Sequence, residues 1–280
     1  MALTEFQRNI LRLLAPSRLE HESYVAGGAA LNTQLFAPRR SRDIDLFHDT
    51  IEAVAKTVAA DKTLMEDQGY TLRFVREAPT FAEAVVERDG QSTLIQWIFD
   101  SAFRFFPLVT NDDLGLTLHP FDLATNKVLA MAGRLEVRDF IDLITCCEQI
   151  QPLGYLIWAA CGKDPGFGPP ALLQEIRRGS RYSQAEIDLL DFDGVAPTAK
   201  EIGQRWHLQL KDATAICELL PVDEVGLAVL MADGKPCRLD PTTLADGIKS
   251  ENVDFHQGSI GGAWPVFSSI ASTVETREKS

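Results

Sequence analysis

Gly27-Gly28-Ala29-Ala30-Leu31 is followed by Arg39-Arg40-Ser41-Arg42 and then directly by Asp43-Ile44-Asp45-Leu46-Phe47. A short apolar run, Tyr24-Val25-Ala26, ends at the glycine pair, and residues 29–36 are compatible with a helix. Polar and apolar residues alternate strictly in the last segment, as they do in a strand with one buried face. The stretch therefore predicts a strand, a glycine turn, a helix, a basic turn and a second strand, in that order.

Two carboxylates of the second strand form the first candidate site. Asp43 and Asp45 stand at positions i and i+2, so both side chains project from the same face, about 7 Å apart along the chain. Carboxylates are the hard oxygen ligands that Mg²⁺ prefers, and Mn²⁺ accepts the same ligands. Upstream, Gly27 and Gly28 would let backbone N–H groups approach a triphosphate beside the positive end of the helix. The order of these parts predicts a metal-dependent site for a nucleoside triphosphate (NTP).

A second triplet of the same form, Asp191-Phe192-Asp193, occurs later in the chain. It has no glycine pair upstream and runs directly into Gly194. Because such a triplet is weak evidence without the accompanying motifs, we expect the second copy to lie in a solvated loop.

Regular patterns extend on both sides of the deciding stretch. Helical spacing of apolar residues, β-leaning runs and an Asp89-Gly90 hairpin turn predict the remaining elements. We expect helices at 4–15, 51–69, 120–131 and 137–150, and strands at 70–76, 81–88 and 93–99. This order favours an α+β fold in which a mixed sheet is flanked by helices.

The chain changes character near Pro152. We expect residues 1–150 to form the catalytic domain and residues 151–280 to form a mainly helical region that binds an acceptor or a partner. Helical patterns resume around 183–192 and 198–218, after a Gly- and Pro-rich segment at 164–170. From about residue 233 onward the chain is rich in Gly, Pro, Asp and Ser and gives few periodic cues.

Composition restricts the class of protein and its partners. No apolar run approaches the length of about 18 residues that spans a bilayer, so we expect a soluble, cytoplasmic protein with no membrane partner. The five cysteines form no C-x-x-C pair, which favours buried free thiols over structural zinc or disulfides. The net charge of −13 means that an RNA partner would be held by a focused site and not by bulk charge.

The motifs resemble a known family. The pattern G-G-x-A-L followed by R-x-S-x-D-I-D-L-F is similar to the AbiEii/AbiGii-type toxins of the nucleotidyltransferase-fold superfamily. Two later segments, Asp122–Ala130 with Lys127 and Arg138-Asp139-Phe140-Ile141-Asp142-Leu143, look like that family's lysine and R-D-h-x-D-L motifs. The resemblance covers about residues 20–150.

This resemblance implies a polymerase-β-like fold and a Mg²⁺-dependent transfer of a nucleotidyl group from an NTP. The acceptor would be an RNA, such as a tRNA-like molecule, or a protein, and the family often acts as a toxin with a cognate antitoxin. Two other functions stay open. The chain could be a non-catalytic member that binds nucleotide or a partner, or a small-molecule (antibiotic) nucleotidyltransferase, whose cationic acceptor would suit the acidic net charge.

Carried over residue by residue, the resemblance assigns metal binding to the two strand carboxylates and phosphate binding to the glycine turn. It further implies that Ser41 contacts phosphate or caps the turn and that Lys127 neutralises the triphosphate. Asp139 would orient Lys127 or the acceptor, or act as a base. The expected site residues are Asp43, Asp45, Lys127 and Asp139 for catalysis, and Gly27, Gly28, Arg39, Ser41 and Lys127 for nucleotide binding.

For several residues the sequence allows both a functional and a purely structural interpretation. Lys127 could lie on a solvated helix face, and Arg138 could pair with Asp142 at i,i+4. Asp100 is the candidate third metal ligand, because it follows a strand and shares the face of Gln96 and Ile98, but it could equally be a turn residue. Side chains for which a structural role is expected are His48 at the surface, His119 in a turn before a helix, and Phe103, Phe105 and Phe106 in a buried cluster.

Overall fold

The computed structural model describes residues 2–20, 22–179 and 181–266, and its centre is a mixed sheet of seven strands. The strand order is β3-β4-β5-β2-β1-β8-β7. The strands are β1 (Ser23–Ala26), β2 (Asp43–His48), β3 (Thr71–Ala78), β4 (Phe81–Arg88), β5 (Gln91–Phe99), β7 (Val109–Asn111) and β8 (Gly115–Thr117). The predicted α+β fold with a mixed sheet is therefore confirmed.

Strand pairing follows from the local sequence. β4 and β5 form an antiparallel hairpin across Asp89-Gly90, where both residues have positive φ (53° and 75°), as the predicted turn requires. β2 then pairs parallel with β5 and antiparallel with β1. As a result β2, which carries the two aspartates, is the central strand of the sheet.

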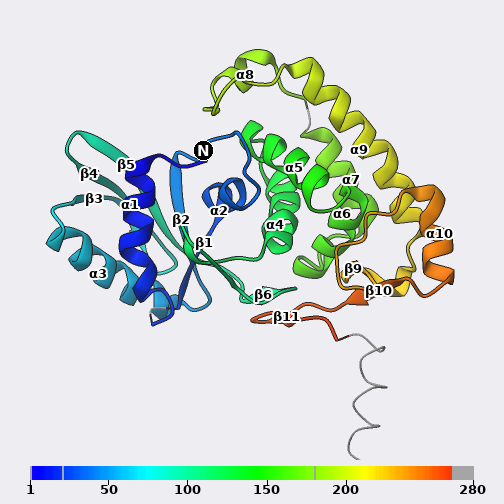
Figure 1. Cartoon of the computed structure of the whole chain (residues 1–280), viewed down its shortest axis with the longest axis horizontal. Helices are drawn as coiled ribbons and strands as arrows, with labels where there is room; N and C mark the ends of the chain where they lie inside the picture. Colours follow the sequence, from blue (N-terminus) through cyan, green and yellow to red (C-terminus); the bar gives the residue numbers. More distant parts are fainter. Residues whose placement is uncertain (1, 21, 180, 267–280) are drawn as a thin grey trace, which may run out of the picture.

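Two helices cover one face of the sheet, α1 (Glu5–Leu14) and α3 (Ile51–Asp67) (Figure 1). Thr4 caps α1 in a capping box with Gln7, and Thr50 caps α3. The indole of Trp97 on β5 donates to Asp61 on α3 over 2.9 Å, so the helix is fixed to the sheet by a polar contact within the core. The alternating apolar residues of the strands point to this face.

The opposite face is covered only in part. α2 (Gly27–Gln34) packs on β1 and β2, and α4 (Pro120–Gly133) and α5 (Val137–Gln149) pack against α2. Strands β3 to β5 project away from these helices (Figure 1). Asp43 and Asp45 lie at the boundary between the covered and the uncovered part.

The second half of the chain continues the same hydrophobic core. α6 (Leu153–Lys163) is almost entirely buried and packs against α4 and α9. The other elements here are α7 (Pro169–Arg178), α8 (Gln184–Asp188), α9 (Ala199–Leu219), α10 (Pro241–Lys249), β9 (Ala228–Met231), β10 (Val253–His256) and β11 (Ser259–Ile260). β11 pairs with β6 (Phe103–Arg104). One cluster of buried side chains runs from Leu3 to Leu230, so a domain boundary near residue 150 stays a prediction.

The structure bears on membrane-spanning helices and on the cysteines in the following way. Among the described helices, none is long and apolar enough to cross a membrane. All five cysteines are free thiols, four of them buried and Cys217 partly buried. Burial raises the pKa of Cys161 to about 11, which keeps this thiol protonated.

Candidate active site

The alternation of β2 divides its side chains between core and cavity. Ile44, Leu46 and His48 are buried against the helices, whereas Asp43 and Asp45 line a cavity of about 500 Å³ on the other face. The surface position expected for His48 is wrong, because strand alternation turns its ring into the core. Its Nδ1 lies 3.3 Å from the carbonyl of Ile98, and burial lowers the pKa of His48 to about 4.

The glycine turn fits tightly against this strand. Gly27 has φ +63°, and a Cβ at this position would come within 1.8 Å of Asp45 Oδ2. A Cβ on Gly28 would come within 2.6 Å of an Arg39 Nη2 atom and 3.2 Å of Ser41 Oγ. Only glycine therefore lets the turn, Asp45 and the basic segment occupy neighbouring positions. The two glycines line the cavity, as the predicted phosphate-binding role requires.

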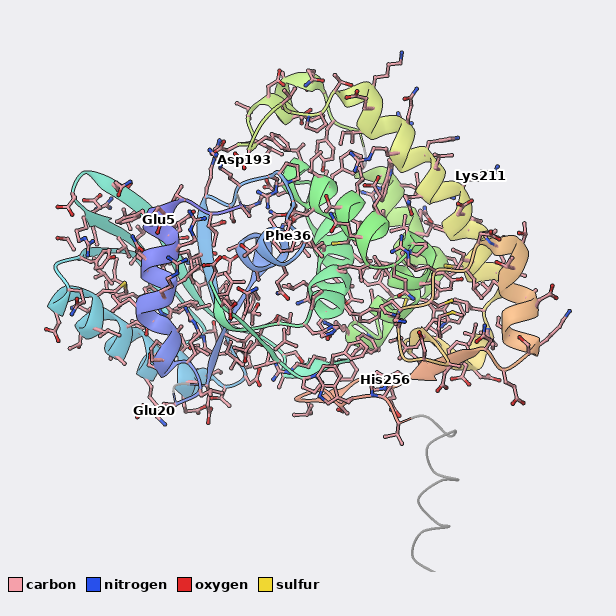
Figure 2. All side chains as sticks on the ribbon, in the orientation of Figure 1. Glu5, Glu20, Phe36, Asp193, Lys211 and His256 are labelled. Carbon is pink, nitrogen blue, oxygen red and sulfur yellow. The ribbon has the colours of Figure 1, made fainter. Side chains whose placement is uncertain are left out.

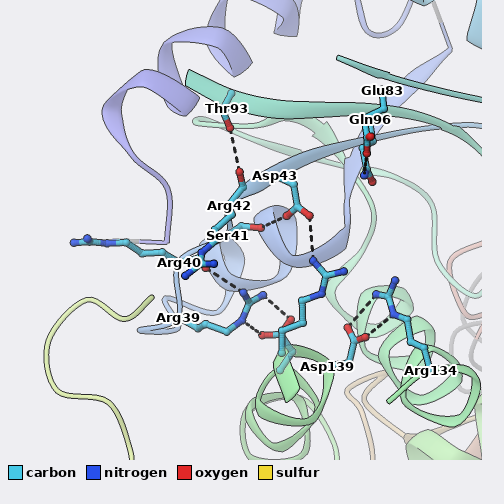
Figure 3. A network of polar contacts seen from close by, with 12 residues as sticks. Arg39, Arg40, Ser41, Arg42, Asp43, Glu83, Thr93, Gln96, Arg134 and Asp139 are labelled. Atoms are coloured by element: carbon cyan, nitrogen blue, oxygen red, sulfur yellow. Dashed lines mark hydrogen bonds and ion pairs between the residues drawn. The ribbon is translucent and has the colours of Figure 1, made fainter. Parts of the chain in front are cut away.

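The two carboxylates have different surroundings. Asp43 accepts a hydrogen bond from Ser41 Oγ (2.9 Å) and forms an ion pair with Arg138 (3.2 Å) (Figure 3). Among the residues that the structure describes, no cation forms an ion pair with Asp45. Burial and the nearby charge of Asp43 raise the pKa of Asp45 to about 7. Ionising Asp45 beside Asp43 therefore costs free energy in the metal-free protein. A divalent cation bound between the two carboxylates would offset this cost.

A buried group of charges connects this strand to α4 and α5. Lys127 Nζ lies 2.8 Å from Asp139 and 2.9 Å from Asp142, and Arg39 forms a bidentate pair with Asp142 at 2.6 and 2.8 Å. Arg134 binds the other oxygen of Asp139 at 2.6 Å (Figure 3). Burial alone would lower the pKa of Lys127, but Asp142 and Asp139 outweigh it and raise that pKa. These five residues hold the basic turn against the helix pair.

Two alternatives considered from the sequence are wrong. Lys127 is not on a solvated face, because its exposed fraction is 7% and it lines the cavity. Arg138 does not pair with Asp142, because Asp142 is turned into the protein toward Arg39 while Arg138 reaches Asp43 on β2. Asp139 contacts Lys127, as the orienting role requires. Burial would raise the pKa of Asp139, but Lys127 and Arg134 outweigh it and hold that pKa below its usual value, which does not suit a base poised near neutral pH.

The strand register does not support Asp100 as the third metal ligand. Asp45 is paired with Gln96 on β5, and Asp100 follows four residues later, about 13 Å along the strand. Magnesium ligands lie about 2 Å from the ion, so Asp100 and Asp45 are too far apart to share one. Within the described ranges, no group of three His, Cys, Asp or Glu side chains forms a metal site. The position beside Asp45 belongs to Gln96, which donates to Glu83 over 2.6 Å.

The far end of the cavity contains charged residues that the sequence analysis missed. Lys163 on α6 lines it and pairs with Asp122 (2.8 Å) and Asn126 (2.7 Å). Burial lowers the pKa of Lys163 in spite of Asp122. Arg104 pairs with Asp49 at the same end. In the sequence, Lys163 stands at the end of an apolar helical stretch. A lysine is common at the end of any helix, so this position did not indicate a role in the cavity.

The aromatic and turn residues behave as expected except for Phe103, which is only partly buried. Phe105 and Phe106 are buried, and Phe103 lies at the cavity wall. His119 precedes α4, accepts a hydrogen bond from the Phe121 N–H and stacks on Phe106. The second triplet, Asp191-Phe192-Asp193, lies outside the cavity and docks on the basic turn through a bridge between Arg39 and Phe192.

The central strand of the mixed sheet carries two acids that face a glycine turn and the helix after it. This arrangement is that of a nucleotidyltransferase fold, which is the class of protein to which the chain belongs. MenT4, a nucleotidyltransferase toxin from Mycobacterium tuberculosis, aligns with 78% of this chain and 83% of its own, at a TM-score of 0.53 and 15% identity. The fold assignment, which confirms the expectation from the motifs, rests on this alignment. At such identity the likeness shows the fold alone.

Two further structures match more loosely. A proposed nucleotidyltransferase from Helicobacter pylori covers 75% of this chain and 97% of its own, with a TM-score of 0.45 and 16% identity. JHP933 from Helicobacter pylori covers 76% and 95%, with a TM-score of 0.42 and 16% identity. No family model and no curated protein matches the sequence.

Proposed function

We propose that this chain is a metal-dependent nucleotidyltransferase that transfers a nucleotidyl group from an NTP to an RNA or protein acceptor. One observation supports the proposal above all others. Asp43 and Asp45 share one face of β2 inside the cavity, and Asp45 lies directly against the glycine turn. Two hard oxygen ligands beside a place for phosphate fit Mg²⁺ or Mn²⁺.

Different residues of the cavity would bind the phosphates and orient the metal ligands. When bound, the metal ion would neutralise charge on the phosphate oxygens. Gly27 and Gly28 would present backbone N–H groups to the triphosphate at the start of α2. Arg134 and Arg138 line the cavity and supply positive charge, while the Asp139–Lys127 pair fixes the lysine in place. Ser41 orients Asp43 through its hydroxyl.

A toxin role with a cognate antitoxin belongs to the same proposal. It rests on the likeness to the AbiEii/AbiGii-type motifs and on the fold shared with MenT4. Growth arrest on induced expression, absent in an Asp45→Asn variant, would support it.

The test is the transfer of labelled nucleotide from each of the four NTPs into total RNA, lysate protein and an aminoglycoside, with and without Mg²⁺. Asp43→Asn and Asp45→Asn are each expected to abolish labelling. The matched controls are Asp67→Asn and Asp112→Asn, which alter exposed carboxylates outside the cavity and should label normally.

The outcomes separate the competing functions. Labelling that persists in both cavity variants would contradict the proposal. Binding of NTP with no transfer to RNA, protein or an aminoglycoside would instead support a non-catalytic member of the fold. Transfer to the aminoglycoside alone would support a small-molecule acceptor.

A further inference from the structure

The strand register brings a third polar side chain, Gln96, beside the two aspartates. β5 pairs parallel with β2, and Gln96 is opposite Asp45. Neighbouring strands are about 4.8 Å apart, and the side chains of paired residues project from the same face of a sheet. Both residues line the cavity. Asp45 therefore has an amide neighbour at the position that Asp100 is too far along the strand to occupy.

Glu83 determines which way the amide of Gln96 is turned. Glu83 on β4 is opposite Gln96 and accepts a hydrogen bond from its Nε2 over 2.6 Å (Figure 3). A carboxylate has only acceptor oxygens, so the NH₂ group of Gln96 faces Glu83 and the carbonyl oxygen does not. β4 and β2 lie on opposite sides of β5 in the sheet. The carbonyl oxygen is therefore directed away from β4, toward the side of the strand on which Asp45 lies.

The oxygens on this side of the cavity have no donor between them. Among the described residues, none donates a hydrogen bond to the carbonyl oxygen of Gln96, and none forms an ion pair with Asp45. Two neighbouring acceptors repel one another unless a cation or a water molecule lies between them. Carbonyl and carboxylate oxygens are ligands that suit Mg²⁺ and Mn²⁺. The set of atoms thus fits a hard divalent cation.

We propose that Gln96 is a third protein ligand of the metal ion, through its side-chain carbonyl oxygen, and that Glu83 is the positioning residue that holds this oxygen toward the site. This inference rests on the proposed function and completes its metal site. An amide oxygen adds a ligand without adding charge. It therefore strengthens the site without the repulsion that a third carboxylate would cause in the metal-free protein.

The test is the binding of Mn²⁺ to the full chain, measured from the free-ion signal in electron paramagnetic resonance, without nucleotide and with a non-hydrolysable NTP. Gln96→Leu, which keeps the size of the side chain, should weaken Mn²⁺ binding by at least about 10-fold. Gln96→Glu should strengthen it, because a charged oxygen replaces a neutral one. The control is Lys211→Gln, which makes the net charge more negative by the same amount on α9, outside the cavity (Figure 2), and should leave the affinity unchanged.

A double-variant cycle tests the positioning role of Glu83. Glu83→Gln should weaken Mn²⁺ binding in the wild-type background, because a glutamine can also donate and no longer fixes the amide of Gln96. In the Gln96→Leu background the same change should have no effect, since it acts through Gln96. Glu87→Gln removes the same charge from the same face of β4 and should leave the affinity unchanged in both backgrounds. A Glu83→Gln effect that persists without Gln96 would contradict the positioning role.

Asp45→Asn distinguishes failure of this inference from failure of the proposed function. Loss of Mn²⁺ binding in Asp45→Asn, weaker binding in Gln96→Leu and tighter binding in Gln96→Glu is the expected result. Loss in Asp45→Asn with wild-type affinity in both Gln96 variants would overturn the inference and leave the proposed metal site standing. Equal binding by the wild type and Asp45→Asn, or no binding by either, would contradict both.

Thermal unfolding of the same variants tests the purely structural alternative. A Gln96–Glu83 pair that only stabilises the sheet would give variants with a lower unfolding midpoint and an unchanged Mn²⁺ affinity. The opposite effects expected for Gln96→Leu and Gln96→Glu keep the inference testable if one of the two variants folds poorly.

Discussion

Gly27 shows how one residue can be required for the site without bearing any chemistry. It combines a left-handed backbone with a position where a Cβ would overlap the Asp45 carboxylate. Gly69 also has a positive φ (80°) but has open space around its Cβ position, so it isolates the backbone cost. Comparing substitutions at Gly27 and Gly69 therefore separates the cost of backbone strain from the cost of displacing the Asp45 side chain.

Gly27→Ala is therefore expected to lose Mg²⁺–NTP binding and to destabilise the protein by about 2–4 kcal/mol, from backbone strain and overpacking together. Gly69→Ala should cost only about 1 kcal/mol and bind NTP normally. Denaturant unfolding and NTP titration measure both effects. Equal behaviour of the two variants would show that Asp45 is not displaced.

The raised pKa of Asp45 predicts a pH dependence of stability. The folded carboxyl holds its proton up to about pH 7, whereas in the unfolded chain it ionises near its usual value of 3.8. Between these values the unfolded state binds fewer protons, so this group's contribution to stability falls as the pH rises and levels off above about 7. In metal-free protein, Asp45→Asn should match the wild type near pH 4 and be more stable at pH 8.

The difference between 3.8 and about 7 corresponds to about 4 kcal/mol at about 1.4 kcal/mol for each pKa unit, so we expect a gain at pH 8 of between about 1 and 4 kcal/mol, or a rise in Tm of at least about 2–4 °C. Thermal unfolding at both pH values, in the presence of a chelator, measures it. A variant that is less stable than the wild type at pH 8 would mean that the ionised carboxylate is stabilised by its surroundings and not penalised by them.

At the scale of elements, α5 determines how the site is assembled. Its residues Arg138, Asp139 and Asp142 contact β2, α4 and the basic turn respectively. The loop after α8 holds the same turn from outside, since the Arg40 N–H donates to Asp191 O over 2.8 Å. The basic turn is thus fixed between two segments that are distant in the sequence.

Asp142→Asn is expected to destabilise the protein by about 3–5 kcal/mol, because it leaves Arg39 and Lys127 buried with less compensation. The matched control is Asp113→Asn, which removes one of the two carboxylates that pair with Arg12, in an exposed pair of the same 2.6 Å length, and should cost less than about 1 kcal/mol. Denaturant unfolding compares the two variants. A small effect of Asp142→Asn would show that water replaces the lost charge.

At the scale of the whole molecule, the shared core predicts cooperative unfolding. Trp97 is buried in the sheet and Trp158 in the helical half, and Trp206 and Trp264 can be replaced by Phe. Variants that retain only Trp97 or only Trp158 should show the same unfolding midpoint by fluorescence, because α4 packs on α6 across residue 150. Two separate midpoints would instead support the predicted division into independently stable domains.

Much of the local structure could be predicted from the sequence because its signals are short in range. The alternation in β2, the Asp89-Gly90 turn and the glycine pair each specify backbone geometry within a few residues. They placed the two aspartates on one face and gave the α+β class. The Pro241 that begins α10, with Asp240 as its cap, is a signal of the same kind that was overlooked.

The partners of the charged residues were decided by tertiary structure alone. The sequence allowed Arg138 to pair with Asp142 on its own helix. In the structure Asp142 is buried and pairs with Arg39 of the basic turn, and Arg138 pairs with Asp43. Asp100 shares a face with Gln96, but only the strand register shows how far it lies from Asp45. Long charged side chains choose among many neighbours, and that choice depends on which segments the fold brings together and shields from water.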